Sequence, residues 1–201
     1  MNNILKVFSL ATPDEIADGI KWYAEAQAIS KKLSLKHDMS LHIVVGVMAA
    51  LSPNNKWERN VQNTDELIAA YLNGEAIESI KVSTYNKMKE KAWSILDAMP
   101  DHDQTISILN GQKIVSFYRN IMGDDTCTVD GHAYNIWRYE RHGLTTDKTN
   151  IGKKLYAEIQ EAYVDAANAT LVNGRKLKAF EMQAITSVSY THLRAHETAC
   201  N

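Results

Sequence analysis

Hydrophobic residues recur at the three- and four-residue spacing of amphipathic helices along nearly the whole chain. Thr12, Pro13 and Glu15 form a helix-start pattern, a capping box with proline in the first turn, so a helix is expected from there to about Leu35. No segment shows the sustained alternation of a half-buried strand. The pattern therefore predicts an all-α fold, a helical bundle of about eight helices.

The other expected helices lie between recognisable stop signals, at about 41–51, 57–71, 84–98, 106–109, 114–121, 131–141 and 151–169, with a last one starting near Arg175. The 41–51 segment is apolar on most of its sides and should be central and buried. Ser40 can cap it, and Pro53 follows its end. The helices are expected to form two lobes around a cleft near Leu51.

Polar groups with possible chemistry gather between Leu109 and Trp137. Asn110 and Gly111 give a turn signal between two apolar runs, which predicts two short helices folded back on each other, a helix-hairpin-helix outline. This places Lys113 at the start of the second helix. Gly123 is expected to close that helix, and Asp130 to cap the helix that begins at Gly131.

The position of these two charged residues suits chemistry on a sugar. The positive end of a helix dipole favours the neutral, nucleophilic form of Lys113, and it holds the Asp130 carboxylate ionised, as a cation stabiliser requires. Simpler interpretations stay open: Asp130 as a cap alone, and Lys113 as a solvated lysine. His132 is more simply a partly buried helix residue, and Tyr134 and Trp137 are more simply core residues.

The net charge of the chain limits how it can bind nucleic acid. The formal net charge is −2 over 201 residues, so any contact with DNA has to be local. Candidate basic patches group Lys81, Lys87, Lys89 and Lys91, then Lys148, Lys153 and Lys154, then Arg175, Lys176 and Lys178. A solvated helix face is the preferred interpretation of any single patch.

The end of the chain is interpreted separately. Val188 to Thr198 looks like the translation of a sequencing-library adaptor, so residues 187–201 are expected to be an artefact and 1–186 a single domain interrupted at its C-terminus. Deleting Ser187 onward should then leave the melting temperature nearly unchanged. Cys200 goes with that segment, which leaves Cys127.

One cysteine cannot build a disulfide framework or a four-thiolate site, so no metal site and no cofactor are expected from the residues present. The longest apolar run, Ile43 to Leu51, is too short to span a bilayer, and the N-terminus lacks a secretory signal pattern. We expect a soluble intracellular protein with no membrane contact, and a monomer.

Four motifs in one order resemble the helix-hairpin-helix DNA glycosylase superfamily, and within it the endonuclease III branch. They are Ala50-Leu51-Ser52-Pro53-Asn54, Tyr85-Asn86-Lys87-Met88-Lys89, the turn before Lys113, and Val129-Asp130-Gly131-His132. Lys113 and Asp130 are 17 positions apart, close to the spacing in that family. The resemblance covers Val44 to Trp137, roughly half the chain, and short members in bacteriophages imply the cytoplasm of a bacterium or a phage-infected host cell.

The resemblance implies an enzyme that binds double-stranded DNA and cleaves the N-glycosidic bond of an extruded base, with or without AP-lyase activity. Lys113 would attack the sugar C1′ to form a Schiff base, and Asp130 would stabilise the sugar cation or activate the attacking group. The implied DNA-binding residues are Asn54, Asn55, Asn110, Gly111, Gln112 and His132.

The sequence also departs from the family pattern. The hairpin has one glycine and is about two residues shorter, so it offers fewer backbone N–H groups to a phosphate than the family's hairpin does. Asn54 replaces a longer glutamine that fills the gap left by the extruded base. The family's cluster-binding cysteines would lie beyond Thr186, so the residues present neither indicate nor exclude an iron–sulfur cluster.

Two other functions are consistent with the same residues. One is a glycosylase-fold phage enzyme that modifies a thymine-derived base without excising it. The other is a non-catalytic helical DNA-binding protein, in which Asp130 only caps its helix and Lys113 only neutralises phosphate.

Overall fold

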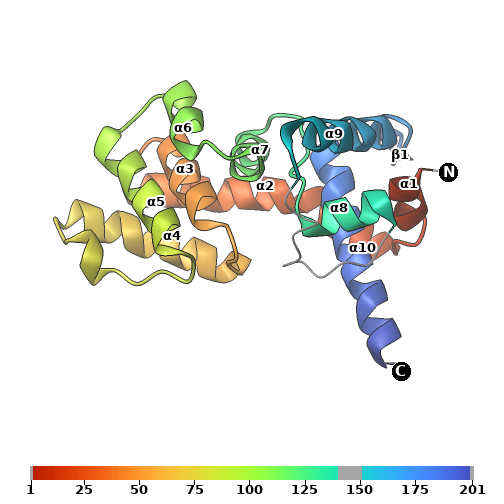
Figure 1. The fold of residues 1–201 in the computed structure, drawn as a ribbon, viewed down its shortest axis with the longest axis horizontal. Coiled ribbons are helices and arrows are strands. Elements are labelled where there is room, and N and C mark those ends of the chain that lie inside the picture. The colour runs from red at the N-terminus through yellow and green to blue at the C-terminus, as the bar shows by residue number, and fades with distance from the viewer. Residues whose placement is uncertain (1, 140–150, 200–201) are drawn as a thin grey trace. The chain divides into compact units, whose positions relative to one another are not determined.

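The computed structural model describes residues 2–139 and 151–199. Within these residues the chain forms ten α-helices and one pair of short antiparallel strands (Figure 1). The all-α prediction is confirmed, with more helices than expected. The helices are α1 (Asn3–Phe8), α2 (Pro13–Lys36), α3 (Leu41–Leu51), α4 (Trp57–Leu72), α5 (Asn86–Ala98), α6 (His102–Leu109), α7 (Gln112–Met122), α8 (Gly131–Arg138), α9 (Lys153–Asn168) and α10 (Ala179–Ala199), with a 3-10 helix at Ile77–Ser79.

The chain divides into two compact units. Unit 1 combines Met1–Glu25 with Gly123–Asn201, and unit 2 is Ala26–Met122, so the boundary on the N-terminal side falls inside α2. Two units agree with the two lobes expected from the sequence. The cleft between lobes stays a prediction.

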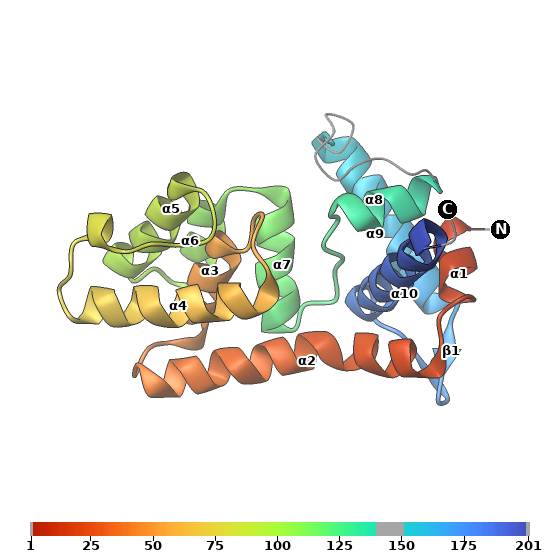
Figure 2. The same cartoon turned by 90° about the horizontal axis from the view of Figure 1, so that it is seen from below.

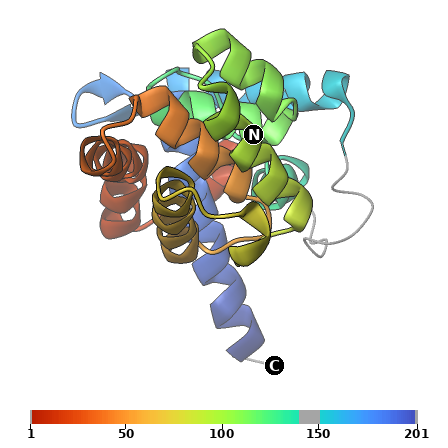
Figure 3. The ribbon, with the colours of Figure 1, turned by 90° about the vertical axis from the view of Figure 1, so that its left-hand side faces the viewer.

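Unit 2 is built around α3. All nine residues from Ile43 to Leu51 are buried, because α4, α5, α6 and α7 pack on different sides of the helix (Figure 3). Gly46 permits the close approach of α6, since a Cβ atom there would lie 2.7 Å from Cγ2 of Thr105. The predicted central and buried helix is therefore confirmed.

Unit 1 has its own apolar core. Helices α1, α8, α9 and α10 pack against one another around it (Figure 2), and Ile16 and Ile20 of α2 pack against the same core. Gly19 of α2 meets α10 directly, because a Cβ atom at this position would lie 2.7 Å from the backbone of Ile185. A side chain at position 19 would push the two helices apart.

The start of α2 follows the predicted capping box. The Thr12 N–H donates to Oε2 of Glu15 at 2.8 Å, and the Glu15 N–H donates to Oγ1 of Thr12 at 3.3 Å. The helix runs from Pro13 to Lys36, one residue past the expected end. Both predictions are confirmed.

The helix expected to start near Arg175 was placed wrongly. Arg175–Lys176 is strand β2, paired antiparallel with β1 (Leu171–Val172), and α10 begins only at Ala179. Asn173 and Gly174 between the strands both have positive φ, 52° and 78°, as a tight hairpin turn requires. This Asn-Gly turn was the missed signal. Oδ1 of Asp125 accepts a hydrogen bond from the Ala179 N–H at 2.7 Å and so fixes the start of α10.

Two further differences concern α6 and α1. Helix α6 begins at His102, four residues before the start expected at Ile106. Helix α1 was not predicted, because six residues give too short a pattern to recognise. Helix α8 ends at Arg138, and the expected end at Arg141 lies outside the described residues. None of the helices described is both long enough and apolar enough to cross a bilayer.

Helix α10 continues into the segment interpreted as a translated adaptor. Ser189 is only 1% exposed, and Tyr190 packs, partly buried, against the core of unit 1. Ser189 follows Met182 and Ile185 at helical spacing, so it falls on the same buried face. This differs from the expectation that the segment contributes little to the core. Its adaptor origin stays a prediction.

Candidate functional site

Asp130 caps the N-terminus of α8. Its Oδ1 atom accepts a hydrogen bond from the Ala133 N–H at 2.8 Å, and its backbone is extended, as expected of a cap residue. The side chain is half-buried. The predicted cap is confirmed, and it fixes one carboxylate oxygen at the positive end of the helix.

The segment before Asp130 is held by α9. Nε2 of Gln160 donates to Oγ1 of Thr126 at 2.9 Å and to the Cys127 carbonyl at 2.8 Å. The hydroxyl oxygen of Tyr156 accepts a hydrogen bond from the Val129 N–H at 3.0 Å. Three of the four residues before Asp130 are therefore hydrogen-bonded to α9.

The sequence did not identify Tyr156 and Gln160. Tyr156 is buried in α9, whereas its neighbour Leu155 packs only partly buried against the core. A tyrosine beside an apolar stripe was the available signal, since a buried hydroxyl needs a polar partner.

Polar side chains also lie beneath this segment. The Tyr23 hydroxyl lies 3.4 Å from Oγ1 of Thr128 and 3.4 Å from Oε1 of Gln183. Burial raises the pKa of Tyr23 above its usual range, and the negative charge of Asp130 raises it further. The same two causes raise the pKa of the Cys127 thiol. Cys127 is thereby kept as a buried thiol and is no candidate nucleophile.

His132 lies on α8 two residues after the cap. Its ring meets the Tyr190 ring edge-on, with centroids 5.9 Å apart, and its Nδ1 atom is buried without a hydrogen-bond partner. It lines a pocket of about 280 Å³ with Ser187, Val188, Thr191 and His192. Because those four belong to the 187–201 segment interpreted as an artefact, we assign this pocket no role. Tyr134 and Trp137 pack in the core of unit 1, as their simpler interpretation predicted.

The predicted turn connects α6 and α7 in unit 2. Asn110 has the left-handed conformation, with φ 41° and ψ 44°, and α7 begins two residues later at Gln112. A Cβ atom on Gly111 would lie 3.1 Å from Cγ1 of Ile114, so the backbone at this position has little spare room. Lys113 is the second residue of α7 and is exposed.

A lysine from α5 holds the same turn. Nζ of Lys91 donates to the carbonyl of Leu109, the last residue of α6. Burial lowers the pKa of Lys91, and the positive charge of Lys87 lowers it further. The sequence assigned Lys91 only to a basic patch, because nothing local indicates a contact 18 positions away.

Other cations from the candidate patches also have internal partners. Nζ of Lys89 donates to the carbonyls of Ile77 and Ile80 at 2.9 and 2.8 Å. Arg175 forms a two-bond pair with Glu181, each bond 2.8 Å long. Lys148 lies outside the described residues. Lys89 and Arg175 therefore stabilise the protein's own structure through these hydrogen bonds.

Asn54 and Asn55 follow the C-terminus of α3. Asn54 is exposed and has a positive φ of 52°, while Nδ2 of Asn55 donates to the Leu51 carbonyl at 3.2 Å. Oδ1 of Asn55 is buried without a hydrogen-bond partner. Oγ1 of Thr84 donates to the Pro53 carbonyl at 2.6 Å and ties the loop to the segment before α5.

The candidate residues fall into two groups. Asn54, Asn55, the turn and Lys113 belong to unit 2, whereas Asp130 and His132 belong to unit 1. The cleft expected near Leu51 stays a prediction. In residues 2–139 and 151–199, His, Cys, Asp and Glu side chains form no group of three that could hold a metal ion.

A family model described as a family of unknown function (DUF7178) matches residues 1–194. The chain belongs to this family. The match extends from before α1 into α10 and includes Val188 to Arg194, the first residues of the segment interpreted as an adaptor. No curated protein and no solved structure matches the chain.

Proposed function

We propose that the chain is a DNA glycosylase of the helix-hairpin-helix type, which cleaves the N-glycosidic bond of a base extruded from double-stranded DNA. The observation that carries the proposal is the fixed Asp130 carboxylate, which caps α8 and follows a segment held by Tyr156 and Gln160. A carboxylate held in place before the reaction needs no reorganisation to stabilise a developing cation.

The turn between α6 and α7 supports the DNA-binding part of the proposal. A helix start presents backbone N–H groups without intrahelical partners, which can bind a phosphate oxygen. The Gly111 and Gln112 backbone would form this contact, with the Asn110 side chain beside it, since the Asn110 N–H already donates to the Ile106 carbonyl. Lys91 would hold the turn in shape through the Leu109 carbonyl. Asn54, at an exposed loop position, would enter the gap left by the extruded base, and His132 would contact DNA near Asp130.

The proposed reaction begins with breakage of the C1′–N bond. The base leaves with the electron pair of the C1′–N bond, and positive charge develops on the sugar opposite Asp130. Either the neutral Lys113 amine or a water molecule then adds to C1′. Addition of water, with loss of one proton, yields an abasic site. Addition of the amine, with loss of one proton, yields a glycosylamine; its C1′–O4′ bond then breaks as the C1′=N bond forms, and the resulting Schiff base can lead to strand cleavage. Lys113 is exposed, so any burial of its amine would come from the bound DNA.

The test uses the full chain and a set of duplexes, each with one damaged or modified base. Alkali-sensitive abasic sites are counted, and the digested nucleosides are measured by mass spectrometry. Abasic sites that disappear with Asp130→Asn are the expected result. A mass-shifted intact nucleoside would show that the enzyme modifies the base and does not excise it. DNA binding with neither product would leave a non-catalytic DNA-binding protein.

A further inference from the structure

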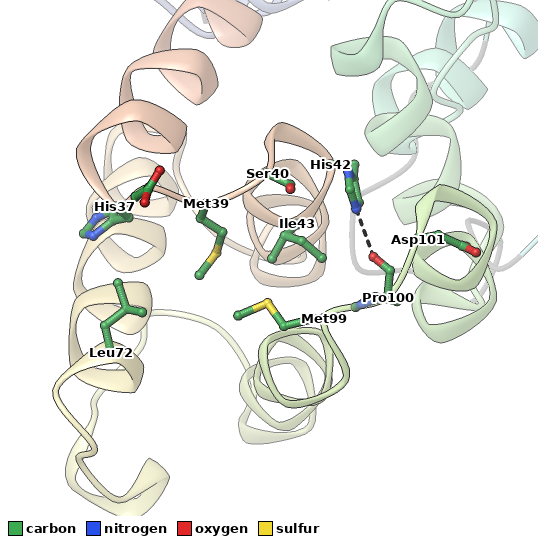
Figure 4. A pocket seen from close by; sticks show the side chains of 10 residues that line it. His37, Met39, Ser40, His42, Ile43, Leu72, Met99, Pro100 and Asp101 are labelled. Atoms are coloured by element: carbon green, nitrogen blue, oxygen red, sulfur yellow. Dashed lines mark hydrogen bonds between the residues drawn. The ribbon is translucent and has the colours of Figure 1, made fainter.

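Unit 2 contains a pocket of about 420 Å³ that the proposed DNA chemistry does not use. It lies where the loop before α3 meets the ends of α4 and α5. The side chains of Met39, Ile43, Leu72 and Met99 point into one space (Figure 4). Its volume falls within the usual range for sites that bind small molecules or single large side chains, roughly 300–1,000 Å³.

Met99, which lines the pocket, has an unfavourable backbone conformation. It ends α5 with φ 41° and ψ 51°, the left-handed region in which glycine is the usual residue at a helix end. The side chain is nevertheless a methionine that is 49% exposed, and Leu72 across the pocket is 52% exposed. A strained backbone that presents an exposed apolar side chain indicates a role beyond stability.

The lining favours an apolar ring. Thioether groups make favourable contacts with the edges of aromatic rings, and both Met39 and Met99 turn their sulfur atoms towards the space (Figure 4). The histidine rings of the pocket wall already have partners. His42 Nε2 lies 2.9 Å from the Pro100 carbonyl, and His37 Nε2 lies 2.6 Å from Oδ1 of Asp65. One nitrogen of each ring is therefore already used within the protein.

The rim is acidic. Asp38 and Asp101 both line the pocket and are exposed. The nearby cation Lys36 is paired with Asp65 at 2.7 Å, so it offsets neither carboxylate. Two carboxylates repel a phosphate-bearing ligand and attract a cationic one. We propose that this pocket binds an aromatic side chain carried by a basic segment of a partner polypeptide.

The first test uses the methionine methyl groups as probes. The full chain with ¹³C-labelled methionine methyls is titrated with tripeptide amides of sequence Lys-Trp-Lys, Lys-Ala-Lys and Glu-Trp-Glu, and with adenosine monophosphate. We expect Lys-Trp-Lys to shift the Met39 and Met99 methyls in a saturable way. Glu-Trp-Glu should bind roughly threefold or more weakly at low salt, and Lys-Ala-Lys should not shift them. Shifts produced only by the nucleotide, or equally by Lys-Ala-Lys, would overturn the proposal.

Variants separate binding from folding. Met99→Gly removes the side chain and suits the left-handed backbone, so it should keep or raise the melting temperature while weakening Lys-Trp-Lys binding by about tenfold. Leu35→Ala is the matched control, since Leu35 is 84% exposed on α2 and lies outside the pocket. Unchanged binding in Met99→Gly, or an equal loss in Leu35→Ala, would contradict the proposal.

A further variant tests whether the acidic rim selects a cationic ligand. Asp38 has a positive φ of 48°, which asparagine also tolerates, so Asp38→Asn removes the charge and keeps the backbone. It should narrow the difference in affinity between Lys-Trp-Lys and Glu-Trp-Glu. An unchanged difference would show that the acidic rim does not select the ligand.

Discussion

The hydroxyl oxygen of Tyr156 accepts a hydrogen bond from the backbone N–H of Val129 at 3.0 Å. Val129 directly precedes Asp130, so this bond connects α9 to the residue before the cap of α8. Asp130 is thus placed by two constraints, its own cap bond to Ala133 and the attachment of the preceding segment. The position of the carboxylate depends on a helix that begins 23 residues after it.

Tyr156→Phe should destabilise the protein by about 1–3 kcal/mol, because the buried Val129 N–H would lose its partner. If Asp130 is catalytic, base release should also slow, since its segment loses an attachment. Urea unfolding and abasic-site formation measure the two effects. Tyr85→Phe is the control, because Tyr85 is exposed. Equal stability of Tyr156→Phe and wild type would show that this hydrogen bond does not contribute to the free energy of unfolding.

The two roles of Asp130 can be separated by two substitutions. Asp130→Asn keeps an oxygen for the Ala133 N–H and removes the charge, whereas Asp130→Ala also removes the cap, at about 1 kcal/mol of stability. Base release should fall by about a hundredfold or more in both, as for the loss of one preorganised electrostatic group. Asp125→Asn, which alters the cap of α10 in the same unit, is the control. Full turnover by Asp130→Asn would leave Asp130 as a cap alone.

Glu181 should make stability depend on acid pH. Burial raises its pKa, but the hydrogen bonds from Arg175 and from the Lys178 backbone outweigh burial, so the pKa lies below its ordinary value of 4.5. A lowered carboxylate pKa stabilises the fold above the ordinary value, and this contribution is lost as pH falls through the folded-state pKa.

We therefore expect Glu181→Gln to lower the free energy of unfolding at pH 7 by roughly 1–2 kcal/mol, a value reduced because Arg175 is half-exposed. The difference from wild type should shrink as the pH falls from 4.5, the ordinary value, through the lowered pKa of Glu181. Urea unfolding across pH 3–7 measures it, with the exposed Glu158→Gln as control. A difference that is constant with pH would contradict the assigned ion pair.

Local rules explain which features the sequence could predict. The capping box at Thr12, the buried α3 and the Asp130 cap each depend on residues within a few positions of one another. The Asn173-Gly174 hairpin is also local, and it was missed because each strand has only two residues, too few to show alternation.

Contacts between distant residues could not be predicted in this way. Tyr156 meets Val129 across 27 positions, and Lys91 meets Leu109 across 18. A tyrosine or lysine on a helix surface has many possible partners, and only the packing of α9 and α5 selects one. The residues that position the candidate site therefore emerged only from the structure, although Asp130 and the turn were visible in the sequence.

The turn between α6 and α7 allows a paired substitution. Asn110→Gly suits the left-handed backbone and should leave stability unchanged or raise it by up to about 1 kcal/mol. Gly111→Ala places a Cβ atom 3.1 Å from Cγ1 of Ile114, so the Ile114 side chain has to shift by a few tenths of an ångström. If this turn binds phosphate, Gly111→Ala should weaken DNA binding more than Asn110→Gly does, as measured by fluorescence anisotropy. Equal affinities would place the DNA contact elsewhere.

Lys113 can be tested as the nucleophile by chemical trapping. If its amine forms a Schiff base with C1′, borohydride should reduce that intermediate to a stable protein–DNA adduct on a duplex with the substrate base, and Lys113→Gln should abolish the adduct while largely keeping DNA affinity. Lys154→Gln is a matched control, because Lys154 is also exposed and is also the second residue of its helix, α9. An adduct that persists in Lys113→Gln would place the attacking amine on another residue. Base release without any adduct in the wild type would make water the nucleophile, with Asp130 as its activator.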